Sequence, residues 1–512
     1  MKPIRLAAGL LTVGAWTFLS RIFGFARDIM IAAFLGSGPV AQAFLIAFSL
    51  PNLFRRFFAE GAFNMAFIPM FSKRLERGEN AHEFMNEAFA ALGTLLIVFT
   101  LIGTAAMPWL VIAMASGFIG DARFDLAVQF GRIAFPYILF ISLAALLSGV
   151  LNATGRFAVA AAAPVLLNLL FIGAMAGADA LGLDIGRALA WAVPVAGIAQ
   201  LALLWRGAAR AGYAPTLVRP RLTPQIRRLA IVAAPAALAG GVVQINLLVG
   251  RQVASFFDGA VVWLSLADRL YQLPLGVVGI AIGVVLLPDL SRRLGAGDAA
   301  GGQAAFNRAA EISLALTVPA AIALLVVPVP VVSVLFERGA FDASDVGPTA
   351  LAVAIYALGL PAFVLQKVLQ PLFFAREDTR SPFRYAVLAM VVNAAVAIGL
   401  APFIGFIAAA IGTSVAAWAM VFQLWFGSRA MAREATLDAR FRARAPRIVL
   451  ASSVMGAALW SAALWIGPGF DVAGLRYLAL AGLVALGIVV YAGAGQALGA
   501  FRVSEFRSAF RR

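Results

Sequence analysis

The chain has 512 residues, of which 62% are hydrophobic and only 12% are charged, about half the charged fraction of a typical soluble protein. It contains no cysteine and a single histidine, His82, which excludes disulfides, cysteine or histidine metal clusters and histidine-based catalysis. The net charge of +16 does not indicate a nucleic-acid partner, because most of the 40 basic residues lie in short segments between apolar runs.

Apolar runs of about 20 residues or more, long enough to cross a bilayer as helices, recur along the whole chain. They lack the alternation of a transmembrane β-barrel, so we predict an all-α polytopic membrane protein. The first run is longer than a signal-peptide core and lacks a cleavage site, so we expect it to remain as a span. We predict fourteen transmembrane helices: 6–35, 39–70, 86–115, 124–151, 158–178, 188–206, 229–255, 262–288, 309–335, 348–374, 384–402, 406–426, 447–467 and 476–500.

The distribution of lysine and arginine predicts how these spans are oriented. With a cytoplasmic N-terminus, about 28 of the 40 basic residues fall in cytoplasmic segments. The opposite side receives only Arg123, Arg187, Arg338 and Arg476. We therefore expect both termini in the cytoplasm, which requires an even number of spans.

The first span contains three charged residues in "SRIFGFARD" (20–28), namely Arg21, Arg27 and Asp28. A charge at the centre of a membrane helix costs roughly 2.5–3.5 kcal/mol, so something must compensate for it. A structural ion pair with Asp28 that fixes helix packing accounts for one arginine. The second arginine indicates a water-filled cavity or a substrate.

The second span contains "LPNLFRRFFAEGAF" (50–63), in which Pro51 predicts a kink before two adjacent arginines. Glu60 lies four residues after Arg56, so a local ion pair is the simplest interpretation of that arginine. This local ion pair explains Arg56 but does not explain Arg55. We predict that Arg55 contacts an anionic substrate, because the planar guanidinium binds phosphate bidentately.

The two halves of the chain contain matching segments, which indicate an internal duplication. "FIPMFSKRLERGE" (67–79) and "LLPDLSRRLGAGD" (286–298) share the pattern Pro-x-x-Ser-basic-Arg-Leu-x-x-Gly-acid. Asn168 in the first half matches Asn393 in the second, at a spacing of about 225 residues. We expect both asparagines to form hydrogen bonds between helices rather than to bind a ligand.

The duplication predicts two six-helix lobes, residues 1–220 and 221–440, followed by an extra helix pair within 441–512. Because each lobe has an even number of helices, the lobes share one orientation and enclose a central cavity near the membrane midplane. Cations outnumber acids at this depth, so the cavity should attract an anion.

The second lobe contains "LADRLYQLPLG" (266–276), where Pro274 corresponds to Pro51. Asp268 and Arg269 have two interpretations: they form ion pairs with neighbouring helices, or Arg269 completes the cavity from the second lobe. The chain has no Walker A, GxSxG or HExxH motif, so we expect neither ATP hydrolysis nor enzymatic chemistry, and no cofactor.

Four stretches together resemble the bacterial lipid II flippases, the MurJ/MviN family of the multidrug/oligosaccharidyl-lipid/polysaccharide exporter superfamily. The resemblance implies two six-helix lobes, fourteen helices and alternating access, with lipid II, the undecaprenyl-pyrophosphate-linked disaccharide-pentapeptide, as substrate. The stretches are "SRIFGFARD" (20–28), "LPNLFRRFFAEGAFNMAFIPMFSK" (50–73), "FPYILFISLAALLSGVLNATGRF" (135–157) and "ADRLYQLPLGVVGIAIGVVLLPDLSR" (267–292).

The resemblance also implies roles for individual residues. The extra helix pair would line a groove for the polyprenyl tail, and Glu60 is the glutamate of the family's "FAEGAF" stretch. Asp28, Arg56, Glu60 and Asp268 are expected to form supporting ion pairs. The implied substrate-binding arginines of the cavity are Arg21, Arg27, Arg55 and Arg269.

Two positions depart from the family pattern. Gln42 stands in the segment where some members carry an acid. Asn393 and Thr413 match neutral ligands of a cation site found in some members, but no acid accompanies them, so we expect no metal site and no sodium coupling.

These observations predict a flippase that moves a peptidoglycan precursor from the cytoplasmic to the periplasmic leaflet of the bacterial inner membrane without ATP hydrolysis. We expect a monomer surrounded by membrane lipids, with cell-wall synthesis proteins as candidate partners. The alternatives are a polysaccharide-lipid or drug exporter of the same superfamily, or a non-transporting scaffold for cell-wall enzymes. A cationic-drug antiporter would need carboxylates at the midplane, where this chain is net basic.

Overall fold

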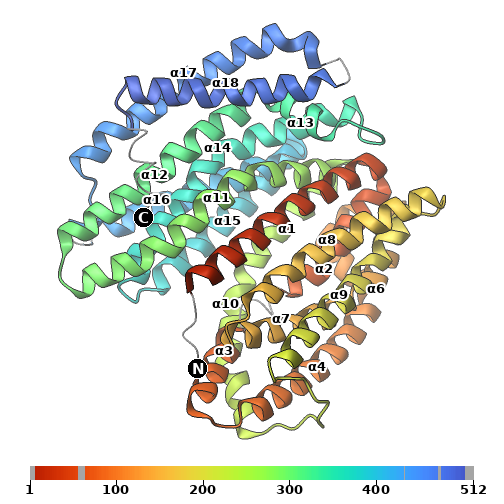
Figure 1. The fold of residues 1–512 in the computed structure, drawn as a ribbon. Helices are drawn as coiled ribbons and strands as arrows, with labels where there is room; N and C mark the ends of the chain where they lie inside the picture. The colour runs from red at the N-terminus through yellow and green to blue at the C-terminus, as the bar shows by residue number, and fades with distance from the viewer. Residues whose placement is uncertain (1–5, 56–63, 430, 432, 471–473, 502–512) are drawn as a thin grey trace. The chain divides into compact units, whose positions relative to one another are not determined.

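The computed structural model describes residues 6–55, 64–429, 431, 433–470 and 474–501, which are almost entirely helical (Figure 1). The β-structure among them is limited to one isolated bridge between Arg338 and Phe341. Nine of the described helices are long and apolar enough to cross a membrane, or ten if a bent pair is counted as one span. The predicted all-α membrane fold is therefore confirmed.

The chain forms two compact units. Unit 1 is Met1–Val262 with Arg338–Phe341, and unit 2 is Trp263–Glu337 with Asp342–Arg512. The lobe boundaries at 220/221 and 440/441 stay a prediction.

Each of the fourteen predicted spans corresponds to one helix or to two consecutive helices. The helices in the first part of the chain are α1 (Leu6–Leu35), α2 (Pro39–Arg55), α3 (Asn64–Arg77), α4 (Ala81–Ala105), α5 (Met107–Ala115), α6 (Ala122–Ala134), α7 (Tyr137–Ala153), α8 (Phe157–Ala180), α9 (Ile185–Arg210) and α10 (Pro224–Ala254). Those of the second part are α11 (Ala260–Gly295), α12 (Ala299–Val326), α13 (Pro328–Phe336), α14 (Ala343–Phe374), α15 (Arg380–Ile404), α16 (Ile407–Ser428), α17 (Ala439–Phe470) and α18 (Leu475–Ala497).

One helix break recurs at matching places in the two halves of the chain. The predicted spans 86–115 and 309–335 are each divided into a long helix and a nine-residue helix, α4–α5 and α12–α13. Pro108 and Pro328 stand at the start of the short helices, because a proline lacks the N–H that a continuous helix would need there.

In each half of the chain, the helix that follows the short helix begins with an aspartate cap: α6 follows α5, and α14 follows α13. Asp121 accepts a hydrogen bond from the backbone N–H of Arg123, and Asp342 accepts one from that of Ser344. The Arg123 backbone N–H is the main cause that lowers the pKa of Asp121, and the Ser344 hydroxyl lowers the pKa of Asp342 most. Both carboxylates therefore stay ionised and stabilise the first turns of α6 and α14.

Aromatic side chains fill the core of unit 1. Phe171 of α8 packs against Phe44 and Phe48 of α2, with ring centroids 6.1 and 5.2 Å apart. α8 also packs along α1 and α9. The helix that carries the first charged stretch is thus fixed against a well-packed neighbour.

In unit 2, α14 and α15 both pack along α16, and α12 packs against α14 and α17. Leu290, Val364, Leu372 and Leu424 are buried together in its main core. α17 and α18 run side by side as a pair in Figure 1, and α18 also packs against the short helix α13.

Candidate functional site

Arg27 lies in a buried polar cluster between α1 and α8. Its Nη2 and Nε donate to Asp28 Oδ1 at 2.7 and 3.0 Å. Its Nη1 donates to Asn168 Oδ1 at 3.0 Å, and Asn168 Nδ2 donates to the carbonyl of Ser20 at 3.0 Å. The ring centroid of Phe171 lies 5.7 Å from the guanidinium carbon, within the range of a cation–π interaction. The cluster satisfies most of the hydrogen-bonding groups of this arginine inside the protein.

The sequence predicts that one of the two arginines of α1 forms a structural ion pair with Asp28. Arg27 is the arginine that forms this pair. Arg27 is 7% exposed and Asp28 is 9% exposed, so each buried charge is stabilised by the other. Asn168 forms a hydrogen-bonded link between helices, as expected from the sequence. Direct contact of Arg27 with a substrate stays a prediction.

Arg21 has a different environment on the same helix. It is exposed on the surface of unit 1, and within the part of the chain that the structure describes it makes no ion pair. It lies seven residues before Asp28, about two helical turns. Its guanidinium is therefore accessible to a ligand in a way that the guanidinium of Arg27 is not.

Arg55 is the last residue of α2 and is partly buried. Its neighbour Phe54 packs edge-on against Phe99 and Phe135, at centroid distances of 4.9 and 5.9 Å, which fixes this end of the helix. Arg56 and Glu60, the predicted ion pair, lie outside the described residues.

Asp268 and Arg269 lie on α11, in unit 2. Asp268 is partly buried and its Oδ2 accepts a hydrogen bond from the Gln272 side chain one turn later. Arg269 is exposed on the surface of its unit. Because the other three predicted arginines belong to unit 1, their assembly into one binding site with Arg269 stays a prediction.

The two candidate neutral cation ligands lie on adjacent helices, α15 and α16. Asn393 is buried, and a Cβ atom added to Gly412 would lie 2.7 Å from its Oδ1, so the two helices approach closely here. The Thr413 hydroxyl donates to the Ala409 carbonyl of its own helix at 2.9 Å. Among the residues that the structure describes, no group of three or more acids or histidines could hold a metal ion.

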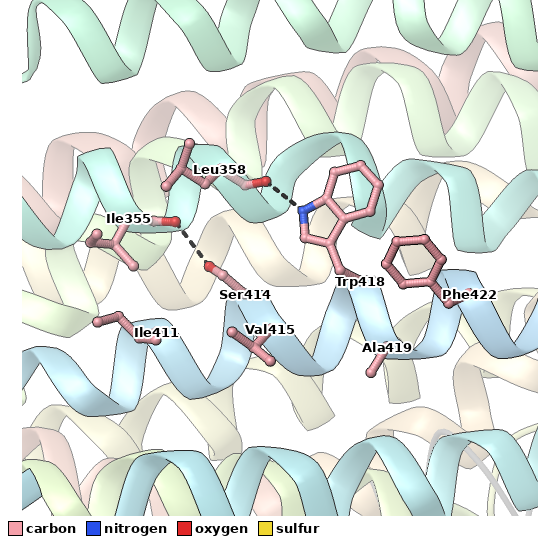
Figure 2. Close-up of a pocket in the computed structure, with 8 residues that line it drawn as sticks. All are labelled: Ile355, Leu358, Ile411, Ser414, Val415, Trp418, Ala419 and Phe422. Carbon is pink, nitrogen blue, oxygen red and sulfur yellow. Dashed lines mark hydrogen bonds between the residues drawn. The ribbon is translucent and has the colours of Figure 1, made fainter. Parts of the chain in front are cut away.

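Unit 2 contains an apolar groove of about 610 Å³ between α14 and α16. Figure 2 shows that Ser414 donates to the Ile355 carbonyl and Trp418 donates to the Leu358 carbonyl, both at 2.9 Å. These bonds satisfy the polar atoms within the protein, so the groove presents hydrocarbon. Its other lining residues are Ile411, Val415, Ala419 and Phe422.

A second apolar groove, of about 420 Å³, lies between α13 and α18. Its lining residues are Val334, Leu335, Tyr477, Leu480, Ala481, Val484, Ala485 and Ile488. The sequence predicts that the extra pair, α17 and α18, lines a groove for the lipid tail. The observed groove has α18 as one wall, but its other wall is α13 rather than α17.

Sequence reasoning did not identify the ion-pair cluster around Glu311, which joins α12 to the start of α17. The Glu311 side chain is buried and accepts from Arg308 of its own helix and from Arg440 and Arg444 of α17, at 3.2, 3.1 and 2.5 Å. Such a cluster is invisible in a local pattern, because Arg440 lies 129 residues after Glu311.

Residues 31–475 match the family model described as Lipid II flippase MurJ. The chain belongs to this family. It is 44% identical over 511 residues to the probable lipid II flippase MurJ of Rhizobium meliloti (strain 1021), covering 98% of this chain and 95% of that one.

Two further matches agree with this assignment. The probable lipid II flippase MurJ of Rhizobium tropici is 47% identical over 427 residues, covering 82% of this chain and 80% of the relative. The fold resembles a solved structure titled "Lipid II flippase MurJ, inward closed conformation", with a TM-score of 0.79, 23% identity and coverage of 98% and 100%. The chain is thus a multi-pass inner-membrane protein of the MurJ family.

The structure also accounts for one departure from the MurJ pattern. Arg123 is buried where α6 begins, and its guanidinium donates to Asp121 at 2.6 Å and to Gln42 Oε1 at 3.2 Å, and pairs with Asp258 at 3.0 Å. Gln42 therefore supplies a neutral acceptor to a buried cation that already has two acids. An acid at position 42 is not required to compensate the charge of Arg123 in this chain.

Proposed function

We propose that this protein moves lipid II from the cytoplasmic to the periplasmic leaflet of the inner membrane by alternating access, without ATP hydrolysis. The match of residues 31–475 to the MurJ family carries the proposal, together with identity of up to 47% to relatives named for this activity. The protein would act as a carrier with two lobes, and its role in the cell would be to supply the peptidoglycan precursor.

The headgroup would be held by the arginines. The pyrophosphate is a dianion or more, and guanidinium groups bind phosphate oxygens through two parallel hydrogen bonds. The accessible guanidiniums of Arg21 and Arg269 suit direct contact, and Arg55 at the end of α2 would extend the site. Arg27 would act mainly by fixing α1 against α8.

The polyprenyl tail would stay in hydrocarbon throughout the transport cycle. The groove between α13 and α18 is the best candidate to hold part of the tail, because it is apolar and one of its walls is α18 of the extra helix pair. A tail that remains in the membrane does not have to cross the polar path of the headgroup, so only the headgroup is exchanged between leaflets.

Both termini would lie in the cytoplasm, as the basic residues in the connecting segments indicate. With an inside-negative membrane potential, outward movement of the anionic headgroup is then favoured by about 2.3 kcal/mol per charge per 100 mV. The return of the empty arginine-lined cavity toward the cytoplasm is also favoured. The potential could thus drive the cycle without a coupled ion.

Translocation of labelled lipid II in proteoliposomes tests this proposal. We expect the wild-type protein to move lipid II between leaflets, and Arg21→Glu and Arg269→Glu each to lower the rate at least tenfold, because each places a negative charge against the pyrophosphate. Both arginines are exposed, so the folded protein should tolerate the substitutions better than at the buried Arg27.

Arg219→Glu, which reverses an exposed arginine in the segment between α9 and α10, is the matched control and should transport normally. Wild-type rates in both test variants, with the proteins stably inserted, would contradict the arginine site. Absence of lipid II movement by the wild-type protein would instead favour a non-transporting scaffold, and movement of cationic drugs would favour a drug exporter.

A further inference from the structure

Asp345, in the first turn of α14, is a buried acid that the arginine site does not use. Its side chain is only 4% exposed. Trp263, in the first turn of α11, donates from its indole Nε1 to Asp345 Oδ1 at 2.7 Å. Among the described residues no basic side chain pairs with this carboxylate. The indole N–H is the only side-chain donor that this carboxylate has among the described residues.

A second polar group without a partner lies one turn further along α14. Thr349 is fully buried, and its hydroxyl makes no hydrogen bond among the described residues. Residues four apart share a face of a helix, so the Thr349 hydroxyl and the Asp345 carboxylate lie on the same side of α14. Buried polar atoms without partners are rare in native proteins, and each needs an explanation such as an absent ion.

The helices packed against α14 offer Asp345 little compensation. α12–α13 has no charged residue between Glu311 and Glu337, and α15–α16 has none between Arg384 and Arg429. On α14 itself the next charged residue after Asp345 is Lys367, about six turns away.

Other charged and titratable groups near this end of unit 2 have different partners. Glu337 accepts from the Ser333 hydroxyl, Asp342 caps α14, and Arg476 donates to the Glu337 carbonyl. Arg338, which follows Glu337, bridges through its backbone to Phe341 and belongs to unit 1. The titratable residues further along the two helices are Asp268, Arg269, Tyr271, Asp289, Arg292 and Arg293 on α11, and Tyr356 and Lys367 on α14.

We propose that Asp345 and Thr349 form a binding site for an exchangeable monovalent cation, a proton or Na⁺. A cation on the carboxylate would supply the positive partner that no described basic side chain provides, and the small remaining exposure gives the ion access. Ionisable residues in transmembrane helices commonly mark proton and ion pathways. The site is distinct from the pair Asn393 and Thr413, which lies on α15 and α16.

Occupancy of this site would change the contact between α11 and α14. The indole N–H of Trp263 is a good partner for an ionised carboxylate and a poorer one for a protonated or sodium-bound carboxylate. α11 also carries Arg269, six residues after Trp263, so the cation would act on the helix that holds a proposed substrate ligand. This link to transport rests on the proposed function, whereas the binding of the cation does not.

Tryptophan fluorescence of the purified full-length protein in lipid vesicles tests the site without any lipid II. The emission is recorded from pH 4 to pH 9 in sodium-free buffer, and at fixed pH with NaCl replacing choline chloride. We expect the wild-type emission to titrate with pH or with Na⁺, and this component to be lost in Asp345→Asn and in Trp263→Phe. A pH transition alone identifies the proton, and a saturable Na⁺ response identifies sodium.

The matched control is Asp125→Asn, which removes an exposed acid from the first turn of α6, the helix that follows the first break as α14 follows the second. It should titrate as the wild type does. Thr349→Val keeps the carboxylate and should shift the midpoint, and it serves as the second test if Asp345→Asn does not fold.

Identical titrations of the wild type, Asp345→Asn and Thr349→Val would overturn the proposal. In lipid II transport assays, Asp345→Asn should lose the pH or Na⁺ dependence of the rate that the wild type shows. A wild-type protein that titrates but moves no lipid II would contradict the proposed function and leave the cation site supported.

Discussion

At the scale of single residues, the charges of α1 have separate roles that their spacing does not reveal. Arg27 and Asp28 form a buried pair, linked to α8 through Asn168, whereas Arg21 is exposed. The difference is one of neighbours: Asn168 and Phe171 of α8 lie against Arg27, whereas Arg21 forms no ion pair among the described residues. The same helix can therefore be anchored by one arginine and present another to an anion.

The buried pair should contribute strongly to stability. Arg27→Met removes the ion-pair partner of the buried Asp28 carboxylate, so we expect a loss of about 3–5 kcal/mol in the free energy of unfolding. The double variant Arg27→Met/Asp28→Leu should recover most of this loss, because apolar side chains of similar volume replace the pair. Thermal unfolding of the detergent-solubilised protein, monitored by circular dichroism, measures both effects.

The double variant also separates the two roles of Arg27. If this arginine only fixes α1 against α8, the stable double variant should retain a substantial part of the lipid II transport rate. A double variant that is stable but inactive would show that Arg27 contacts the substrate as well. A single variant that melts at the wild-type temperature would contradict the structural role of the pair.

At the scale of helices, the extra pair α17–α18 is held to the rest of unit 2 by polar as well as apolar contacts. Glu311 of α12 receives three arginines, two of them from the first turns of α17. Asn307 adds hydrogen bonds to the backbone of the segment just before α17, at Thr436 and Asp438. These contacts fix the start of α17 against α12, and so support the helix that packs along α18, one wall of the α13–α18 groove.

Glu311→Gln should loosen this attachment. The variant keeps the shape of the side chain but loses its charge, so we expect a loss of about 2 kcal/mol of local stability. Hydrogen–deuterium exchange of residues 439–447 should then be about 30-fold faster. Asp289→Asn is the matched control, because it breaks an ion pair with Arg293 on α11 and should leave exchange at α17 unchanged. Unchanged exchange at 439–447 in Glu311→Gln would refute the anchoring role.

At the scale of the whole molecule, the topology follows from two physical requirements: each span needs about 20 apolar residues, and the basic segments stay in the cytoplasm. Nine of the described helices, or ten if the bent pair is one span, meet the first requirement, and every predicted span corresponds to one helix or a consecutive pair. The orientation is a separate inference from charge and needs its own test.

The absence of cysteine makes that test direct. Leu181→Cys, in the exposed turn after α8, should react with a membrane-impermeant maleimide in intact spheroplasts. Leu222→Cys, in the exposed segment before α10, should react only after the membrane is permeabilised. The unmodified chain is the blank, and the reverse labelling pattern would place the termini in the periplasm.

The sequence by itself determined the class of the protein, its spans, its repeat and its family. These properties can be predicted because the bilayer imposes one length and one polarity on every span, and each span satisfies its backbone hydrogen bonds within its own helix. The charged motifs "SRIFGFARD" and "ADRL" also pointed to candidate binding residues without any structure.

Only the tertiary structure decided which charged side chains pair with each other. Asn168 contacts Arg27 across 141 residues, Arg440 contacts Glu311 across 129, and Asp345 contacts Trp263 across 82. Such partners are brought together by the packing of helices that are distant in sequence. Burial makes the electrostatic interaction between neighbouring charges strong, because little water screens it. That packing separates the anchored Arg27 from the accessible Arg21, and it leaves Asp345 without a basic partner among the described residues.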